Sequence, residues 1–329
     1  MAKCSVLVLA YNQEKYIRQC LDGVLMQRAD FEYELVVGED YSTDSTRKIC
    51  EEYAMKNPAV RVLSTSNGEN LGYTENWKRT LAECRGEYIA ICEGDDYWTD
   101  ALKLQKQVEY LDAHPRCGLC YTDCNIYYED TGIWERAIFA NGQSNMNHEN
   151  VMWGDGYRGN LTWVIRRDVL ADVVIPKHCS DVPLCLLYEI FLRSELGFLK
   201  DVTGVFRKHV GSFSNTPTDR RKDYWYHRNY TVMRLKYAAL MPNAEFTCKH
   251  CYGEALSLYE TAKEFGDSEY MGLIADYYKS HDDELYDYLM QQNRRIAELN
   301  QELERLQTSK KYKVGTLVLK PFSYLRKKV

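Results

Sequence analysis

The N-terminal part of the sequence alternates between short apolar runs and segments with helical periodicity. The apolar runs predict strands at about 5–10, 34–38, 61–63, 86–92 and 118–128, and the segments between them predict helices at about 14–26, 46–55, 74–84 and 101–114. Strands separated by helices of this length form mostly parallel sheets, because a parallel neighbour is reached only through a long crossover. We therefore expect an α/β fold, with helices flanking a mostly parallel sheet.

Acidic side chains gather directly after two of these strands. Glu39 and Asp40 follow the second strand, and Glu93, Asp95 and Asp96 follow the fourth. The carboxyl ends of parallel strands share one edge of a sheet, and open α/β sheets bind their ligands there. Clustered carboxylates repel one another unless a cation sits among them. The pattern favours a site for a divalent metal and a phosphate group, and a solvated acidic turn is the alternative.

The residues after the first strand argue against two common nucleotide-binding folds. Ala10-Tyr11-Asn12-Gln13 stands where a dinucleotide-binding dehydrogenase would carry G-x-G-x-x-G. The sequence also has no G-x-x-x-x-G-K-S/T segment, which excludes a standard P-loop.

Length and charge set broad limits on the protein class. The 329 residues have room for one large domain or two smaller ones. A net charge of −6 gives no overall attraction to nucleic acid. No apolar run reaches the roughly 18–20 residues that span a bilayer, and the first residues lead straight into a strand, so we expect no signal peptide.

Twelve cysteines are scattered through apolar and helical contexts. We interpret them as reduced thiols that act as small apolar side chains in a cytoplasmic protein. Structural zinc is the alternative for the neighbouring Cys117, Cys120 and Cys124 and for Cys248 with Cys251, although a strand pattern points alternate side chains apart.

The second half is less regular. A loop-rich stretch over 133–160 precedes a predicted strand at 161–165, a helix at 182–194 and short strands at 198–199 and 202–206, and the pattern is helical from about 218 to 281.

A heptad pattern follows near the C-terminus. Its apolar seam consists of Leu285, Leu289, Gln292, Ile296, Leu299, Leu303 and Leu306. The spacing favours either a coiled-coil homodimer or a single amphipathic helix on its own domain. The tail beyond it combines basic, apolar and aromatic residues, which suits an anionic membrane surface. A packed terminal helix is the alternative there.

Four segments in fixed order carry a resemblance to a known family: 5–12, 36–44, 70–72 and 86–98. This order closely resembles the family 2 glycosyltransferases, inverting enzymes with a GT-A fold that use nucleotide-diphosphate sugars. The resemblance covers about residues 3–128. A weaker likeness continues to about residue 215, where Asp181-Val182-Pro183-Leu184 and Val205-Phe206-Arg207-Lys208-His209 look like the D-W-x-L and Y-R-x-H elements of the acceptor side.

The resemblance also implies a domain organisation. Residues 1–215 would form the GT-A domain, with a nucleotide-binding half at 1–128 and an acceptor half at 129–215. A helical region at 216–283, the amphipathic or coiled-coil helix at 284–308 and the basic apolar tail at 309–329 would follow. The tail resembles the basic ends of bacterial surface-polysaccharide transferases in this family.

In this family resemblance, the nucleotide would bind at the ends of the first two strands. Tyr11 would stack on the base, and Asp40 would accept a hydrogen bond from its ring N–H, because a flat base suits a ring face and an imide suits a carboxylate. Ala10 and Asn12 would line the same pocket, and Asp95 would contact the ribose or the metal. The alternatives are a core role for the Tyr11 ring and a capping role for Asp40 at the following helix.

The resemblance implies a divalent metal, Mn²⁺ or Mg²⁺, held by Asp95, Asp96 and His209. Arg207 would offset phosphate charge, with a structural role as the alternative. Glu93 stands where the family usually has Asp, so its role stays open. Trp98 is interpreted as packing beneath the acidic loop.

Asp181 matches the family's general base, which takes the proton of the acceptor hydroxyl. Its alternative role is the N-cap of the helix that follows it.

Together these features predict a metal-dependent, inverting hexosyltransferase. It would move sugar from a UDP- or dTDP-sugar to a hydroxyl of a glycan or lipid-linked acceptor in surface-polysaccharide synthesis, at the cytoplasmic face of the cell membrane. A sugar-nucleotide pyrophosphorylase is one rival, although it would want a Gly-rich basic loop after the first strand. A non-catalytic assembly module with a transferase-like fold is the other.

Overall fold

The computed structural model describes residues 2–65, 68–139, 159–175, 181–211, 220–238, 255 and 257–281, together with Glu298, Gln301 and Arg305. The chain forms two compact units, Met1–Ala244 and Glu245–Val329. The predicted heptad seam and the basic tail lie outside the described residues.

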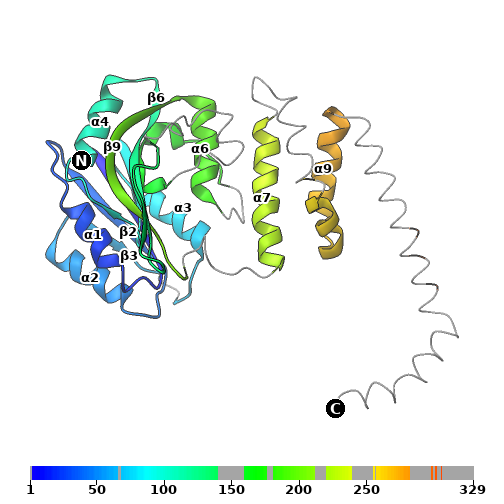
Figure 1. Ribbon diagram of the computed structural model, residues 1–329, viewed down its shortest axis with the longest axis horizontal. Coiled ribbons are helices and arrows are strands. Elements are labelled where there is room, and N and C mark those ends of the chain that lie inside the picture. The colour runs from blue at the N-terminus through cyan, green and yellow to red at the C-terminus, as the bar shows by residue number, and fades with distance from the viewer. Residues whose placement is uncertain are drawn as a thin grey trace, which may run out of the picture. The chain divides into compact units, whose positions relative to one another are not determined.

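The first unit is built on one curled, mixed sheet (Figure 1). Its strands are β1 (Cys4–Ala10), β2 (Tyr33–Glu39), β3 (Val60–Leu63), β4 (Tyr88–Glu93), β5 (Tyr97–Trp98), β6 (Cys117–Tyr128), β7 (Ile133–Glu135), β8 (Trp163–Arg166) and β9 (Glu195–Lys208). Among the described residues the order is β3-β2-β1-β4-β8-β6-β9-β5, with β7 paired to β6. The β3-β2-β1-β4 half is parallel, as is the β6–β9 pair, whereas β8, β5 and β7 run antiparallel to their neighbours.

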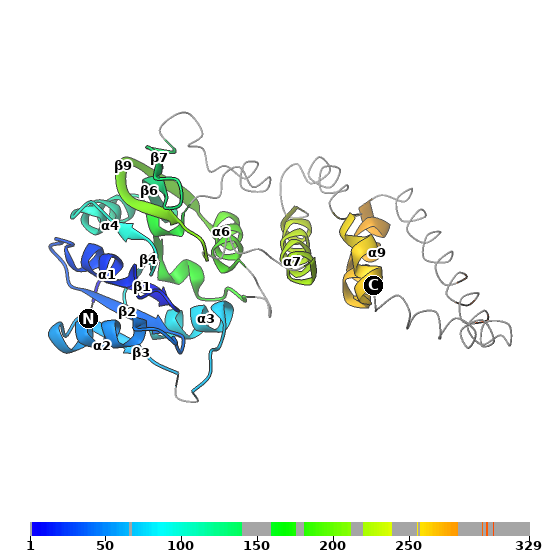
Figure 2. The ribbon, with the colours of Figure 1, turned by 60° about the horizontal axis from the view of Figure 1, so that its bottom comes forward.

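Helices cover both faces of this sheet (Figure 2). One face carries α1 (Ile17–Leu25), α2 (Thr46–Lys56) and α4 (Lys103–Ala113), and the other carries α3 (Tyr73–Glu83) and α6 (Val182–Arg193). Successive side chains of β1 point to opposite faces of the sheet, so the strand contributes to both core layers. Val6 and Val8 pack against α1, and Leu7 and Leu9 lie with Trp77 of α3. The short 3₁₀ helices η1 (Asn160–Thr162) and η2 (Arg167–Leu170) flank β8, and α7 (Arg220–Ala238) follows β9.

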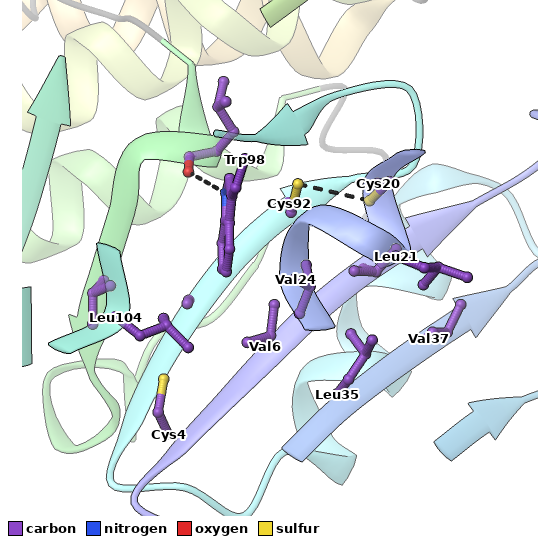
Figure 3. Packing of buried hydrophobic residues seen from close by; sticks show 14 of the residues in the cluster. Cys4, Val6, Cys20, Leu21, Val24, Leu35, Val37, Cys92, Trp98 and Leu104 are labelled. Carbon is purple, nitrogen blue, oxygen red and sulfur yellow. Dashed lines mark hydrogen bonds between the residues drawn. The ribbon is translucent and has the colours of Figure 1, made fainter. Parts of the chain in front are cut away.

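The layer beneath α1 and α4 supports the acidic loop (Figure 3). Trp98, immediately after that loop, is 2% exposed, and its indole N–H donates to the Leu161 carbonyl at 2.9 Å. Cys20 and Cys92 face each other in the same layer with their sulfurs 3.7 Å apart. Trp98 therefore packs under the loop, as the sequence predicts.

Most predicted helices and strands are present, but their first or last residues differ from the predicted ones. Helix α1 begins at Ile17 rather than near Glu14. Helix α3 begins at Tyr73, one residue earlier than predicted, with Gly72 as its N-cap. The two short strands expected at 198–199 and 202–206 form the single strand β9, which stays paired to β6 through register shifts near Asp123. The mixed α/β class is confirmed.

The described cysteines, nine residues from Cys4 to Cys185, are buried free thiols. Burial raises the pKa of the Cys4 thiol to about 12, which keeps it protonated and unreactive. In the described part of the chain no three His, Cys, Asp or Glu side chains form a metal cluster.

The second unit contains α9 (Ser268–His281) and a helical stretch over 257–265. Tyr259, Ala262, Tyr270 and Ile274 are buried between them. None of the described helices combines the length and apolar character that crossing a bilayer requires.

Helix α1 lies directly on β5 at Gly23, where an added Cβ would lie 2.8 Å from the Trp98 carbonyl oxygen and 2.9 Å from its nitrogen. Gly23→Ala should therefore push these elements apart and lower the free energy of unfolding by about 1–3 kcal/mol in urea titrations. The matched control is Gly272→Ala in α9, where an added Cβ meets nothing within 4 Å. If Gly23→Ala is as stable as the wild type, this close contact does not limit packing.

Lys103 is a buried cation in the same layer. Its Nζ donates to Gln107 and lies 4.6 Å from the Trp98 ring centroid, and burial lowers its pKa from 10.5 to about 8. Between these two values the unfolded chain binds more protons, so this group makes the free energy of unfolding rise with pH.

We expect the stability of the wild type relative to Lys103→Met to be constant below pH 7. Above about pH 8 it should increase by up to about 1.4 kcal/mol per pH unit. Urea titrations of both proteins from pH 6.5 to 10 measure the difference, and subtracting the two curves removes the titration of the buried thiols. A difference that does not change with pH would show that Lys103 keeps its ordinary pKa.

Candidate active site

Three parallel strands deliver their carboxyl ends to one edge of the sheet. Ala10 of β1 is in register with Glu39 of β2, and Leu9 is in register with Glu93 of β4. The loops that follow these strands, which begin at Tyr11, Asp40 and Gly94, therefore leave the sheet side by side. The structure thus brings the nucleotide and acidic motifs of the sequence to one place.

The loops after β1 and β2 are joined through Asn12. Its backbone has a φ of 51°, in the left-handed region that few residues other than glycine adopt. Its Oδ1 accepts from the Thr43 N–H at 2.8 Å, and its own N–H donates to the Ser42 hydroxyl at 3.0 Å. The predicted pocket residue Asn12 thus also holds the pocket's two loops together.

Asp40 is 2% exposed and fixes a third loop. Its two carboxylate oxygens accept from the backbone N–H groups of Leu71 at 2.8 Å and Gly72 at 3.0 Å, just before α3. Asp40 therefore anchors α3 and does not cap α2, the next helix along the chain. The N-cap of α2 is Ser45, and the Thr46 N–H of its first turn donates to Asp44 Oδ1 at 2.9 Å. An ionised carboxylate has about four acceptor sites, so two backbone donors leave capacity for a base N–H.

Two tyrosine rings stand at this edge. Tyr11 is 46% exposed, so the alternative of a core ring is wrong. Tyr41 is 41% exposed, has a φ of 58°, and its hydroxyl lies close to Gly68 in the loop before α3. The sequence gives no signal for Tyr41, because a bulky residue is not expected in the left-handed region.

Arg79 of α3 also reaches the end of β2 and was not found from the sequence. Its Nη2 donates to the Glu39 carbonyl at 2.6 Å and its Nε to Asn76 at 2.9 Å. Burial lowers its pKa, and the nearby charge of Asp40 acts in the opposite direction. A cation is thereby held beside the predicted base pocket.

Asp95 and His209 lie in contact across the site. The Asp95 Oδ2 is 3.2 Å from the His209 Nε2, although the two residues are far apart in the sequence. This hydrogen bond raises the pKa of the His209 ring, with burial acting against it. The residue that follows β9 thus meets the acidic loop, and the shared metal role of Asp95 and His209 stays a prediction.

Asp96 lies one step deeper than Asp95. It is 1% exposed, and its Oδ1 accepts from the Arg207 backbone N–H at 2.8 Å. Its Oδ2 is buried and has no hydrogen-bond partner among the described residues. Burial first, and then the charge of Asp95, raise the pKa of Asp96 well above its usual range.

Arg207 connects the two sides of the site. Its Nε donates to the Asp95 carbonyl at 2.9 Å and its Nη2 to Gln19 at 2.6 Å. Its guanidinium carbon lies 4.9 Å from the Tyr16 ring centroid and 5.1 Å from that of Tyr97. These contacts give Arg207 the structural role that was named as the alternative to offsetting phosphate charge. Its positively charged guanidinium also lies next to the acidic loop.

Glu93 joins three elements. Its Oε1 accepts from the Tyr73 hydroxyl at 2.9 Å and from Asn160 Nδ2 at 2.8 Å. Burial, followed by the charge of Asp95, raises its pKa to about 7, and the charge of Asp181 adds to the rise. Asp181 is therefore near enough to Glu93 for their charges to interact.

Asp181 is the N-cap of α6, and its Oδ1 accepts from the Leu184 N–H at 3.0 Å. The capping role is thus present in the structure. It holds the carboxylate at the end of a helix whose first turn also carries Pro183. A fixed carboxylate at this place is compatible with a general base as well as with a cap.

The side-chain atoms that these residues offer as ligands show whether they suit a divalent metal. Asp95 Oδ2 and His209 Nε2 converge within 3.2 Å, and the buried Oδ2 of Asp96, the residue after Asp95, lacks a hydrogen-bond partner among the described residues. Two or three protein ligands are too few for a cage of protein atoms alone. They are what a Mg²⁺-type ion uses when substrate phosphates and water complete its shell. The residues therefore fit a metal that binds together with a diphosphate.

Residues 5–174, just over half of the chain, match the family model described as glycosyl transferase family 2. The chain belongs to this family. An uncharacterized protein of Mycobacterium tuberculosis is 35% identical over 227 residues, which cover 69% of this chain and 64% of that protein. This family 2 member thus spans slightly less than two thirds of the mycobacterial relative's length.

Two further likenesses describe the family context. The putative teichuronic acid biosynthesis glycosyltransferase TuaG of Bacillus subtilis is 27% identical over 68% of this chain and 85% of TuaG. The crystal structure of S. aureus TarS residues 1–349 in complex with UDP-GlcNAc matches with a TM-score of 0.60 at 20% identity, over 87% of this chain and 83% of that one. The structural match confirms the GT-A fold that the motif order implies.

The backbone strain at Asn12 can be separated from its hydrogen bonds. Asn12→Ala and Asn12→Gly both remove the bond to Thr43, but only glycine adopts a φ of 51° without steric cost. Asn12→Ala should therefore be less stable than Asn12→Gly by about 1 kcal/mol in urea titrations. Equal stabilities would indicate that the loop relaxes to another conformation.

Proposed function

We propose that this protein is an inverting glycosyltransferase. It transfers a sugar from a UDP- or dTDP-sugar to a hydroxyl of a glycan or lipid-linked acceptor in surface-polysaccharide synthesis. The observation that carries the proposal is the contact between Asp95 and His209 at the sheet edge that also holds Tyr11 and Asp40. A base-binding end and a cation-binding end are thereby joined in one site.

The nucleotide end of the site is formed by the loops after β1 and β2. The exposed Tyr11 ring offers a stacking face, and the Asp40 carboxylate has acceptor capacity left for an imide N–H. Ala10 and Asn12 border the same space. A uracil or thymine base suits this arrangement, and the UDP-GlcNAc in the TarS complex supports the uridine nucleotide.

The diphosphate end is formed by the acidic loop and the end of β9. Asp95, His209 and Asp96, whose Oδ2 has no hydrogen-bond partner in the part of the chain that the structure describes, would hold a divalent cation, Mn²⁺ or Mg²⁺. Such a cation supplies positive charge next to the leaving diphosphate. Arg207 holds the acidic loop in place through the Asp95 carbonyl and adds a fixed positive charge.

The acceptor end is assigned to Asp181. Its carboxylate would take the proton of the acceptor hydroxyl while the hydroxyl oxygen attacks the sugar C1 from the face opposite the leaving diphosphate, which inverts the anomeric configuration. The hydrogen bond from the Leu184 N–H fixes the carboxylate, and its charge is felt at Glu93 on the donor side. The name of the relative TuaG supports an acceptor that belongs to a cell-surface polysaccharide.

The cation assignment is tested by Asp95→Asn and His209→Gln. Titration calorimetry with UDP should show at least about tenfold weaker binding in Mn²⁺ for each variant. The wild type in EDTA should match the variants, because all three lack the bound cation. Variants that still gain the full effect of Mn²⁺ would place the metal elsewhere.

The base assignment is tested by Asp181→Asn. Asparagine is a good N-cap, so α6 should stay folded and UDP should bind normally. Transfer from UDP-GlcNAc in a membrane extract of the source organism, measured as UDP release, should slow by about 10²- to 10⁴-fold. Asp168→Asn, an exposed acid in η2, is the matched control. A normal rate in Asp181→Asn would contradict the assignment.

A further inference from the structure

A row of aromatic side chains crosses three strands beside the candidate active site. Tyr127 of β6 is in register with Trp134 of β7 on one side and with Arg207 of β9 on the other. Direct cross-strand partners project to the same face of a sheet, so these three side chains form one row. The Tyr127 and Trp134 rings lie 4.6 Å apart between centroids.

The row extends to β5 through Tyr97. Tyr97 pairs with Val205, two residues before Arg207, and its ring centroid lies 5.1 Å from the Arg207 guanidinium. The pKa of Tyr97 responds to the charges of Tyr127 and Arg136 as well as to that of Arg207. Tyr97, Tyr127 and Trp134 are therefore parts of one surface, which we call the aromatic row.

The aromatic row faces away from the core beneath α1 and α4. Trp98 follows Tyr97 along β5, and Phe206 precedes Arg207 along β9. Both Trp98 and Phe206 pack into that core. Side chains alternate between faces along a strand, so the row points away from that core. At the Arg207 end the guanidinium reaches around to Gln19 of α1 and to Tyr16. Trp134 is 37% exposed, and the Arg136 guanidinium lies 4.4 Å above its ring.

One end of the aromatic row is in the donor site. Arg207 binds the Asp95 carbonyl and the Asp96 carboxylate, whereas Trp134 lies at the exposed edge of the sheet. Neighbouring strands are about 4.8 Å apart, so the three strands span about 10 Å, comparable to a disaccharide. A carbohydrate chain whose end reacts at the acidic loop would lie along this surface.

We propose that the aromatic row binds the carbohydrate chain of the acceptor, over the one or two sugars next to its reacting end. The proposal rests on the glycosyltransferase function proposed above. The exposed Trp134 ring and the half-buried Tyr97 and Tyr127 rings offer apolar faces that match the C–H faces of sugar rings, and the Arg136 guanidinium offers donors for hydroxyl or acidic groups.

The charges around the row favour this occupant over a membrane. The turn that joins β6 to β7 carries the exposed acids Glu129 and Asp130, which would repel anionic headgroups. Glu135 lies on the opposite face, where it accepts from the Tyr128 hydroxyl. The aromatic row would therefore select acceptors by their repeating units, separately from the choice of nucleotide.

The experiment compares Trp134→Ala and Tyr127→Ala with Tyr128→Ala, a tyrosine on the opposite face of the same strand. Each protein is first titrated with UDP and Mn²⁺ by calorimetry, and equal affinities show that the donor site is intact. Binding to an array of defined bacterial surface oligosaccharides is then measured in the presence of UDP and Mn²⁺. We expect at least one glycan class to bind the wild type and Tyr128→Ala alike, and to bind the other two variants about tenfold or more weakly.

Several outcomes would overturn the aromatic row as a glycan subsite. They are a wild type that binds UDP but no glycan, equal glycan affinity in Trp134→Ala, and binding to phosphatidylglycerol vesicles that Trp134→Ala abolishes. A wild type that does not bind UDP would instead refute the proposed function on which the subsite rests. Rescue of glycan binding by Trp134→Phe would show that an aromatic face is what the site requires.

Discussion

The parallel pairing of β1 with β2 on one side and β4 on the other is the constraint on which the site depends. Because these three strands run in the same direction and in close register, their final residues leave the sheet together. The loops that follow are then joined by short polar contacts, such as those of Asn12 and Asp40, rather than by a core of their own. The proposed base pocket thus depends on strand register, and a slip of one residue would dismantle it.

Electrostatics sets the second condition of the site. Glu93 and Asp96 both have raised pKa values because they are buried next to the charge of Asp95. Such a concentration of carboxylates is costly in the isolated protein, and nearby Arg207 compensates it only in part. A site of this kind is prepared for a positive partner, and the divalent cation proposed here would provide it.

The sequence predicted the elements and motifs whose signals are local. The apolar runs identified β1, β2 and β4, and the fixed order of motifs brought Asp40, Asp95, Asp181 and His209 forward as candidates. Contacts between segments that are far apart in the sequence could not be predicted from it. Asn160 meets Glu93 only because η1 packs beside the end of β4, and Arg79 reaches β2 only through the placement of α3. Tyr41 was missed for another reason, since its backbone conformation contradicts ordinary residue preferences.

Arg207 has a consequence for how proteins of this architecture can be recombined. It belongs to β9, in the half assigned to the acceptor, yet its side chain binds Gln19 of α1 and the backbone of the acidic loop in the nucleotide half. A chimera that joins the first half of one protein to the second half of another would break this connection unless the residue at position 19 moves with it. The two halves are therefore mechanically linked through Arg207, and an exchange of acceptor preference should be easier by changes at the sheet surface than by swapping halves.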